Sequence, residues 1–197
     1  MNIPIRDARQ ALLTAVANSC GLLAYRKTID DLRKGDITSP IFLNYRKNYT
    51  AYYRVRRDED WLNHYYAYLE ANKNRKDITY EEILRAISSY PHRTSRGLEK
   101  TVEASFASKL LHTINPHHPI WDSQVLKAVR IHLDLWLSFE AHQRECIRLY
   151  SELEKTVKAY LQSGVGHTCI EEFDRLFPEY QNLSDEKKLD FYLWKAE

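Results

Sequence analysis

Apolar residues recur every three or four positions along most of this chain, whereas the alternation typical of a half-buried strand is nearly absent. The first apolar series predicts a helix over about 6–32, which Gly35-Asp36 ends. A tyrosine-rich helical segment then extends to about residue 72. It is interrupted near Asp58, whose carboxylate can cap the helix that follows. The pattern therefore predicts a mainly helical chain.

Local start and stop signals divide the rest of the chain into further helices. Thr79 and Glu82 have the spacing of a capping box, as do Thr168 and Glu171. Apolar residues spaced by four predict one helix from about Leu98 to Ile114. The helix that begins at Thr79 is predicted to end at Tyr90-Pro91, and the helix that begins at Thr168 is predicted to end at Phe177-Pro178. A helix is also predicted to start near Asp122, another to cover 138–162 and stop at 163–166, and a last one to cover 184–195.

Length and composition agree with one globular domain. The chain has 197 residues, of which 44% are hydrophobic and 28% are charged, so it can bury a sizeable core. We predict an all-α fold of about eight helices in a single domain over residues 1–197. If the domain divides into two lobes, we expect the cleft near residues 91–125.

Composition also argues against several classes of protein. No apolar run approaches the roughly 18 residues that a membrane-spanning helix needs. Residues 1–7 lack the charged-then-apolar layout of a signal peptide. Cys20, Cys146 and Cys169 are odd in number and far apart, which disfavours a disulfide framework and a thiolate zinc site. We therefore expect a reduced, cytoplasmic protein that does not contact membranes.

The charge is almost balanced, with 29 basic and 27 acidic residues and a net charge of +2, so any nucleic-acid surface depends on distribution. Segment 44–57 combines tyrosines with arginines, and on a helix its tyrosines share one face. Arg46, Arg54 and Arg57 can flank that face and bind phosphates while the rings contact sugar or base. In the alternative interpretation, the tyrosines pack on the core and the arginines stay in water, where the acidic residues 58–60 can neutralise them.

One segment delivers a single carboxylate to the start of a helix. A buried helix and an Asn-Pro turn lead through Pro119-Ile120-Trp121 to Asp122. The simplest interpretation is an N-cap, in which Asp122 accepts a backbone N–H from the next turn. If a pocket opens above it, the same anionic group can deprotonate a water or stabilise a developing cation. The residues expected to contact a substrate there are Lys109, Trp121 and His118.

A second basic run immediately precedes the buried helix and contributes Arg93, Arg96 and Lys100. Because one of the two basic runs lies beside the candidate carboxylate, DNA is the favoured partner. His112, His117 and His118 lie close together in the sequence. They form no pair on one helix face and have no acidic residue at ligand spacing, so we predict no metal site and no other cofactor.

The order of a buried helix, a turn and Pro-x-x-Asp-x-x-Val, with Pro119, Asp122 and Val125, resembles the catalytic segment of the helix-hairpin-helix DNA glycosylase superfamily. Members of that superfamily are all-α, extrude a damaged base from duplex DNA and cleave its N-glycosidic bond with an Asp at this position. The resemblance therefore implies a catalytic role for Asp122. The nucleophilic lysine of the lyase members is replaced by Ala104, and the standard Gly-x-Gly hairpin by Lys100-Thr101-Val102.

The strings over residues 105–112 and 187–194 are also similar to a bacterial protein family of unestablished function. Two functions stay open at this point. One is DNA binding with base excision by Asp122. The other is a non-catalytic helical module that binds nucleic acid or a protein partner through segment 44–57. Whether the protein is an enzyme depends on whether Asp122 only caps its helix or also lies exposed beside Lys109 or Trp121 with arginines around it.

Overall fold

The structure is a computed structural model that describes residues 10, 13, 20–133 and 136–194. Within these residues it contains nine α-helices, two short 3₁₀ helices and one two-stranded sheet, which confirms the all-α prediction. The α-helices are α2 (Cys20–Leu32), α3 (Leu43–Tyr53), α4 (Glu59–Asn72), α5 (Tyr80–Ser89), α6 (Ala104–Ile114), α7 (Ser123–Ala128), α8 (Phe139–Leu161), α9 (Gly164–Leu176) and α10 (Asp185–Leu193). The 3₁₀ helices are Pro40–Phe42 and Pro178–Tyr180, and the strands are β1 (His92–Thr94) and β2 (Gly97–Glu99).

Most predicted helix starts carry a side-chain cap. In each case an Asp, Ser or Thr oxygen accepts a backbone N–H from the first turn, which has no partner inside the helix. The capping residues are Asp58, Thr79, Asp122, Ser138 and Ser184. The helix predicted over 6–32 ends at Leu32, but most of its first half lies outside the described residues.

The prediction of a helix beginning at Leu98 is wrong. Residues 92–99 form an antiparallel hairpin in which Thr94 pairs with Gly97, and α6 begins only at Ala104. Gly97 has a φ of 116°, a backbone conformation that closes this tight turn and that glycine adopts most readily. Leu98 is 70% exposed, so its spacing from the core residues of α6 does not reflect shared packing.

The capping box predicted at Thr168 is also wrong. Helix α9 begins one turn earlier, because the Ser163 hydroxyl accepts the N–H of Gly166 at 3.1 Å and caps the helix there. Thr168 therefore lies inside the helix, where its hydroxyl donates to the Gly164 carbonyl at 3.0 Å. This internal bond is typical of a threonine that does not cap.

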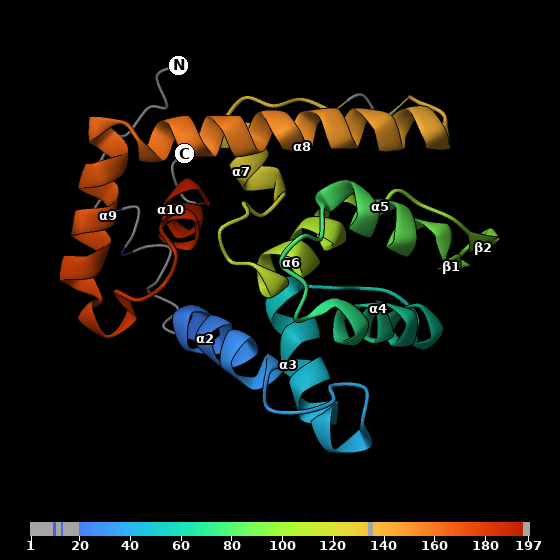
Figure 1. Cartoon of the computed structure of the whole chain (residues 1–197). Helices are drawn as coiled ribbons and strands as arrows, with labels where there is room; N and C mark the ends of the chain where they lie inside the picture. The colour runs from blue at the N-terminus through green and yellow to red at the C-terminus, as the bar shows by residue number, and fades with distance from the viewer. Residues whose placement is uncertain (1–9, 11–12, 14–19, 134–135, 195–197) are drawn as a thin grey trace.

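Helix α6 lies at the centre of the molecule (Figure 1). Nine of its eleven residues are buried, and α4 and α5 pack against it. Helix α8 runs along one side, while α9 covers the end opposite the hairpin. None of the described helices is both long and apolar enough to cross a membrane. The buried length of α6 makes it the element that positions the candidate site.

Candidate functional site

The segment after α6 folds back along that helix. The Trp121 N–H donates to the Ser108 hydroxyl at 2.8 Å, although the two residues are separated by the whole second half of α6. The Pro119 carbonyl accepts the Tyr150 hydroxyl at 2.8 Å, which fixes the returning chain to α8. These bonds bring Asp122, which follows Trp121, back to the level of Lys109 on α6.

Asp122 is the N-cap of α7, as predicted. Its backbone is extended, and its Oδ1 accepts the Gln124 N–H at 2.9 Å. The residue is half-buried. Within the described part of the chain, the Gln124 N–H is the only hydrogen-bond donor to this carboxylate. The second oxygen thus remains able to accept a bond from a water or a ligand.

Lys109 follows Ser108, whose hydroxyl accepts the Trp121 N–H, and it is only 8% exposed. Its Nζ donates to the carbonyl of Tyr53 at 2.9 Å and lies 5.3 Å from the centre of the Phe106 ring. Tyr53 is the last residue of α3, so the ammonium group stabilises the negative end of that helix. A lysine on a helix is usually solvated, and the sequence gives no local signal that this one is buried.

Burial lowers the pKa of Lys109, and four charged groups change it further. Asp122 and Asp190 partly oppose the shift, while Arg54 and Lys187 strengthen it. These residues come from three parts of the chain: the start of α7, the end of α3 and helix α10. Lys109 bonds the carbonyl of Tyr53, the residue before the exposed Arg54, and the Ser108–Trp121 bond holds Asp122 near the same turn of α6.

Sequence reasoning did not identify Lys187 as part of this region. Its Nζ pairs with Asp190 at 2.6 Å and lies 4.7 Å from the ring of Tyr25 and 4.5 Å from the ring of Phe191. Burial alone would lower the pKa of Lys187, but Asp190 and the nearby tyrosines Tyr53 and Tyr25 raise it overall. The only local signal was the i,i+3 spacing of Lys187 and Asp190 on one helix.

The tyrosines of segment 44–57 belong to the core. Tyr45, Tyr49 and Tyr53 are 5%, 0% and 4% exposed, so these rings are not available to contact bases. This outcome agrees with the core-packing interpretation of the segment. Arg46 is half-buried with its guanidinium 6.0 Å from the Tyr66 ring, whereas Arg54 is exposed.

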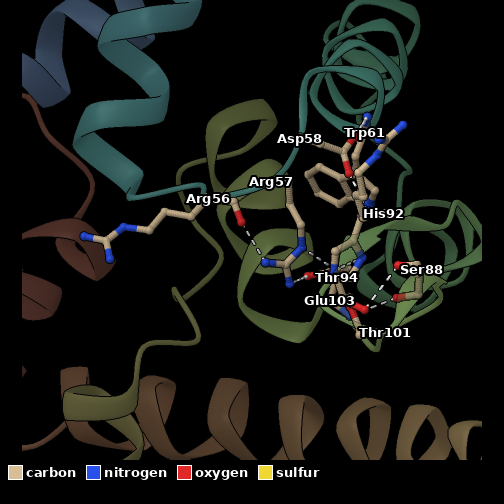
Figure 2. Close-up of polar contacts among 11 residues, drawn as sticks. Arg56, Arg57, Asp58, Trp61, Ser88, His92, Thr94, Thr101 and Glu103 are labelled. Carbon is tan, nitrogen blue, oxygen red and sulfur yellow. Dashed lines mark hydrogen bonds and ion pairs between the residues drawn. The ribbon is translucent and has the colours of Figure 1, made fainter.

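Arg57 is engaged in a partly buried ion pair, unlike the exposed Arg54. Figure 2 shows its guanidinium directed at Glu103, with Nε and Nη2 donating to the two carboxylate oxygens at 2.9 and 2.8 Å. The neighbouring Arg56 extends away from this pair. The acidic residues 58–60 were expected to neutralise the arginines, but Glu103 neutralises Arg57, and Asp58 instead caps α4.

The second basic run lies on and next to the hairpin. Arg93, Arg96 and Lys100 are all exposed, and Arg96 pairs with Glu99 at 3.2 Å. The Arg93 backbone N–H donates to the Asp58 carboxylate, which places these cations next to the acidic start of α4. The hairpin surface is therefore mixed in charge.

The clustered histidines of the α6 turn contact different partners. His112 is fully buried: its Nε2 lies 2.8 Å from the Tyr25 hydroxyl and its Nδ1 lies 2.6 Å from the His118 carbonyl. Because a carbonyl only accepts, Nδ1 carries the proton of this neutral ring. The His118 ring faces Glu154 at 2.9 Å. Among the described residues, no group of three His, Cys, Asp or Glu side chains could hold a metal ion.

Trp121 is 5% exposed and packs in the core beneath the site. It positions Asp122 through its backbone bond to Ser108 and offers little of its ring to a ligand. No model of a known protein family, no curated protein and no solved structure matches this chain. The assignment of function therefore depends on the geometry around Asp122.

Proposed function

We propose that this protein binds DNA and hydrolyses the N-glycosidic bond of a damaged nucleotide, with Asp122 as the catalytic carboxylate. The observation that carries the proposal is the half-exposed Asp122, which has one oxygen without a partner among the described residues and lies near enough to the buried Lys109 to affect its pKa. The resemblance of the Pro119-to-Val125 segment to DNA glycosylases supports the same role.

The chemistry needs a fixed negative charge. As the bond between sugar and base breaks, positive charge develops on the sugar, and a nearby carboxylate stabilises it. The same carboxylate can take a proton from the attacking water, while the departing base gains one. The N-terminus of α7 favours the anionic form of Asp122, so the cap geometry and the catalytic role are compatible.

The experiment that tests this proposal is the substitution Asp122→Asn. Asparagine caps a helix about as well as aspartate, so the fold and melting temperature should change little, while the charge is lost. We expect base release to fall at least about 100-fold. The assay incubates duplexes that carry one alkylated, deaminated or oxidised base and reveals abasic sites by alkaline strand cleavage.

Two further variants serve as controls. Asp122→Ser keeps a capping side chain but removes the carboxylate, and it should be as inactive as Asp122→Asn. Asp60→Asn removes a carboxylate from the first turn of α4, outside the candidate site, and should leave activity intact. An Asp122→Asn protein that releases a base at the wild-type rate would exclude this mechanism.

A second candidate function is a non-catalytic module that binds nucleic acid or a protein partner through segment 44–57. The observation in its favour is that Asp122 already has a structural role as a cap. Because the tyrosines are buried, binding would depend on the exposed Arg54 and Arg56. This function predicts that charge reversal at the two arginines abolishes binding and that Asp122→Asn has no effect in any assay.

A further inference from the structure

We propose that the linker between α3 and α4, residues 54–58, is a phosphate clamp. In this clamp Arg54 and Arg56 bind backbone phosphates of the DNA strand beside Asp122, and the Arg57–Glu103 pair holds the linker in place. The inference rests on the proposed function, since it requires DNA as the partner. It replaces the expectation that Arg57 itself contacts nucleic acid.

The backbone of Arg54 is strained. It has φ 53° and ψ 43°, the left-handed conformation in which helices commonly end on glycine. The Arg54 and Val55 N–H groups both bond the Thr50 carbonyl, which completes the end of α3. A glycine would adopt this conformation without strain, so Arg54 makes the folded protein less stable than a glycine would. Its guanidinium is exposed at this position.

The linker presents its arginines in an alternating pattern. Arg54 and Arg56 are exposed, while Val55 between them is 1% exposed and anchors the segment in the core. Among the described residues, neither exposed guanidinium donates a hydrogen bond or joins an ion pair. Both groups are thus available to an anion, and Arg54 directly follows Tyr53, whose carbonyl accepts the Lys109 ammonium at 2.9 Å.

The side chain of Arg57 holds the backbone of the linker in place. In addition to its two bonds to Glu103, its Nη1 donates to the backbone carbonyl of Arg56 at 2.7 Å. The side chain of Glu103 is 3% exposed, and its backbone N–H is held by the Ser88 hydroxyl at 2.9 Å. Figure 2 shows Arg56 and Arg57 leaving the linker in opposite directions. Arg57 is therefore a positioning residue that acts through Arg56.

The substrate of a glycosylase offers phosphates that such a clamp would bind. A nucleotide that places its sugar against Asp122 has a phosphate on each side, and two arginines close in sequence can bind these phosphates with charge-assisted hydrogen bonds. Such contacts fix the register of the strand and carry no sequence information. The clamp would orient the strand without selecting the base.

The test is fluorescence anisotropy of a labelled duplex with a tetrahydrofuran abasic-site analogue, measured over a series of salt concentrations. Arg56→Gln should weaken binding about tenfold and reduce the slope of log K against log salt by about 1. Arg54→Gly should weaken binding similarly while raising the melting temperature, because glycine relieves the strained backbone. Arg144→Gln, which removes an exposed arginine of α8, is the matched control and should bind as the wild type does.

The positioning role is tested by a double-mutant cycle. Arg57→Lys keeps a positive charge next to Glu103 but cannot make the three bonds of arginine at once, so the fold should persist while binding weakens severalfold. In the Arg56→Gln background, Arg57→Lys should cause little further loss, because its effect acts through Arg56. Fully additive losses would overturn the positioning role.

The outcomes separate this inference from the proposed function. If the wild type binds the duplex but Arg54→Gly and Arg56→Gln bind equally well, the clamp is wrong and DNA remains the partner. If the wild type binds no duplex even at low salt, the proposed function fails and the clamp fails with it. Where the wild type binds the duplex, Asp122→Asn should bind it equally well, because that carboxylate serves the chemical step.

Discussion

The burial and the hydrogen-bond partners of the polar side chains around α6 are set by residues far away in the sequence. Lys109 bonds a carbonyl at the end of α3, and His112 lies between Tyr25 of α2 and the returning segment. A lone lysine or histidine on a helix is most often solvated or at the edge of the core. The capping role of Asp122, in contrast, depends on the next two residues and was predictable from the sequence.

His112 gives a prediction for the pH dependence of stability. Burial, aided by the charge of Lys187, lowers its pKa from 6.5 to about 3 in the folded protein. Below about pH 6.5 the imidazole of His112 therefore takes up a proton in the unfolded chain but stays neutral in the folded protein. Because protonation favours the unfolded chain, the free energy of unfolding is highest above that pH and falls as the pH decreases. We expect the free energy of unfolding to decrease by about 2 kcal/mol between pH 7 and pH 5 because of His112 alone.

The measurement is urea unfolding of the wild type and of His112→Gln at pH 7 and pH 5. Glutamine keeps hydrogen-bonding capacity but does not titrate, so the variant should be less stable at pH 7 and should lose less stability on acidification. If the variant loses as much stability as the wild type does, His112 is not the source of the pH dependence.

At the scale of elements, the capping residues made most helix starts predictable from the sequence. The start of α9 was predicted wrongly because two nearby residues can each act as a cap. Ser163 and Thr168 each offer a hydroxyl near the start of α9, and only geometry decides between them. The hairpin was missed for a related reason. Its strands are three residues long, and the turn depends on the conformation of Gly97, which apolar spacing does not register.

The start of α9 can be tested by two matched substitutions. Ser163→Ala removes the N-cap and should lower the unfolding free energy by about 1 kcal/mol. Thr168→Ala removes an exposed hydroxyl inside the helix and should change it by less than about 0.5 kcal/mol. Both values come from urea unfolding at neutral pH. Equal losses in the two variants would contradict a start at Gly164.

At the scale of the whole molecule, the arrangement combines a catalytic candidate and a basic linker around one central helix. The all-α fold was predictable because the period of apolar residues reflects burial directly. The pairing of Arg57 with Glu103, 46 residues away, was not, because no local pattern links the two. Sequence reasoning therefore found the carboxylate and the exposed Arg54, but it assigned Arg57 to the surface.

The central claim is that this assembly recognises a damaged site in duplex DNA. The most direct measurement is binding to three labelled oligonucleotides across a salt series: an intact duplex, the same duplex with an abasic-site analogue, and a single strand. We predict the tightest binding to the abasic duplex, weakening steeply as salt increases because phosphate contacts release counterions. Absence of binding to all three at low salt would contradict the account and leave Asp122 as a helix cap.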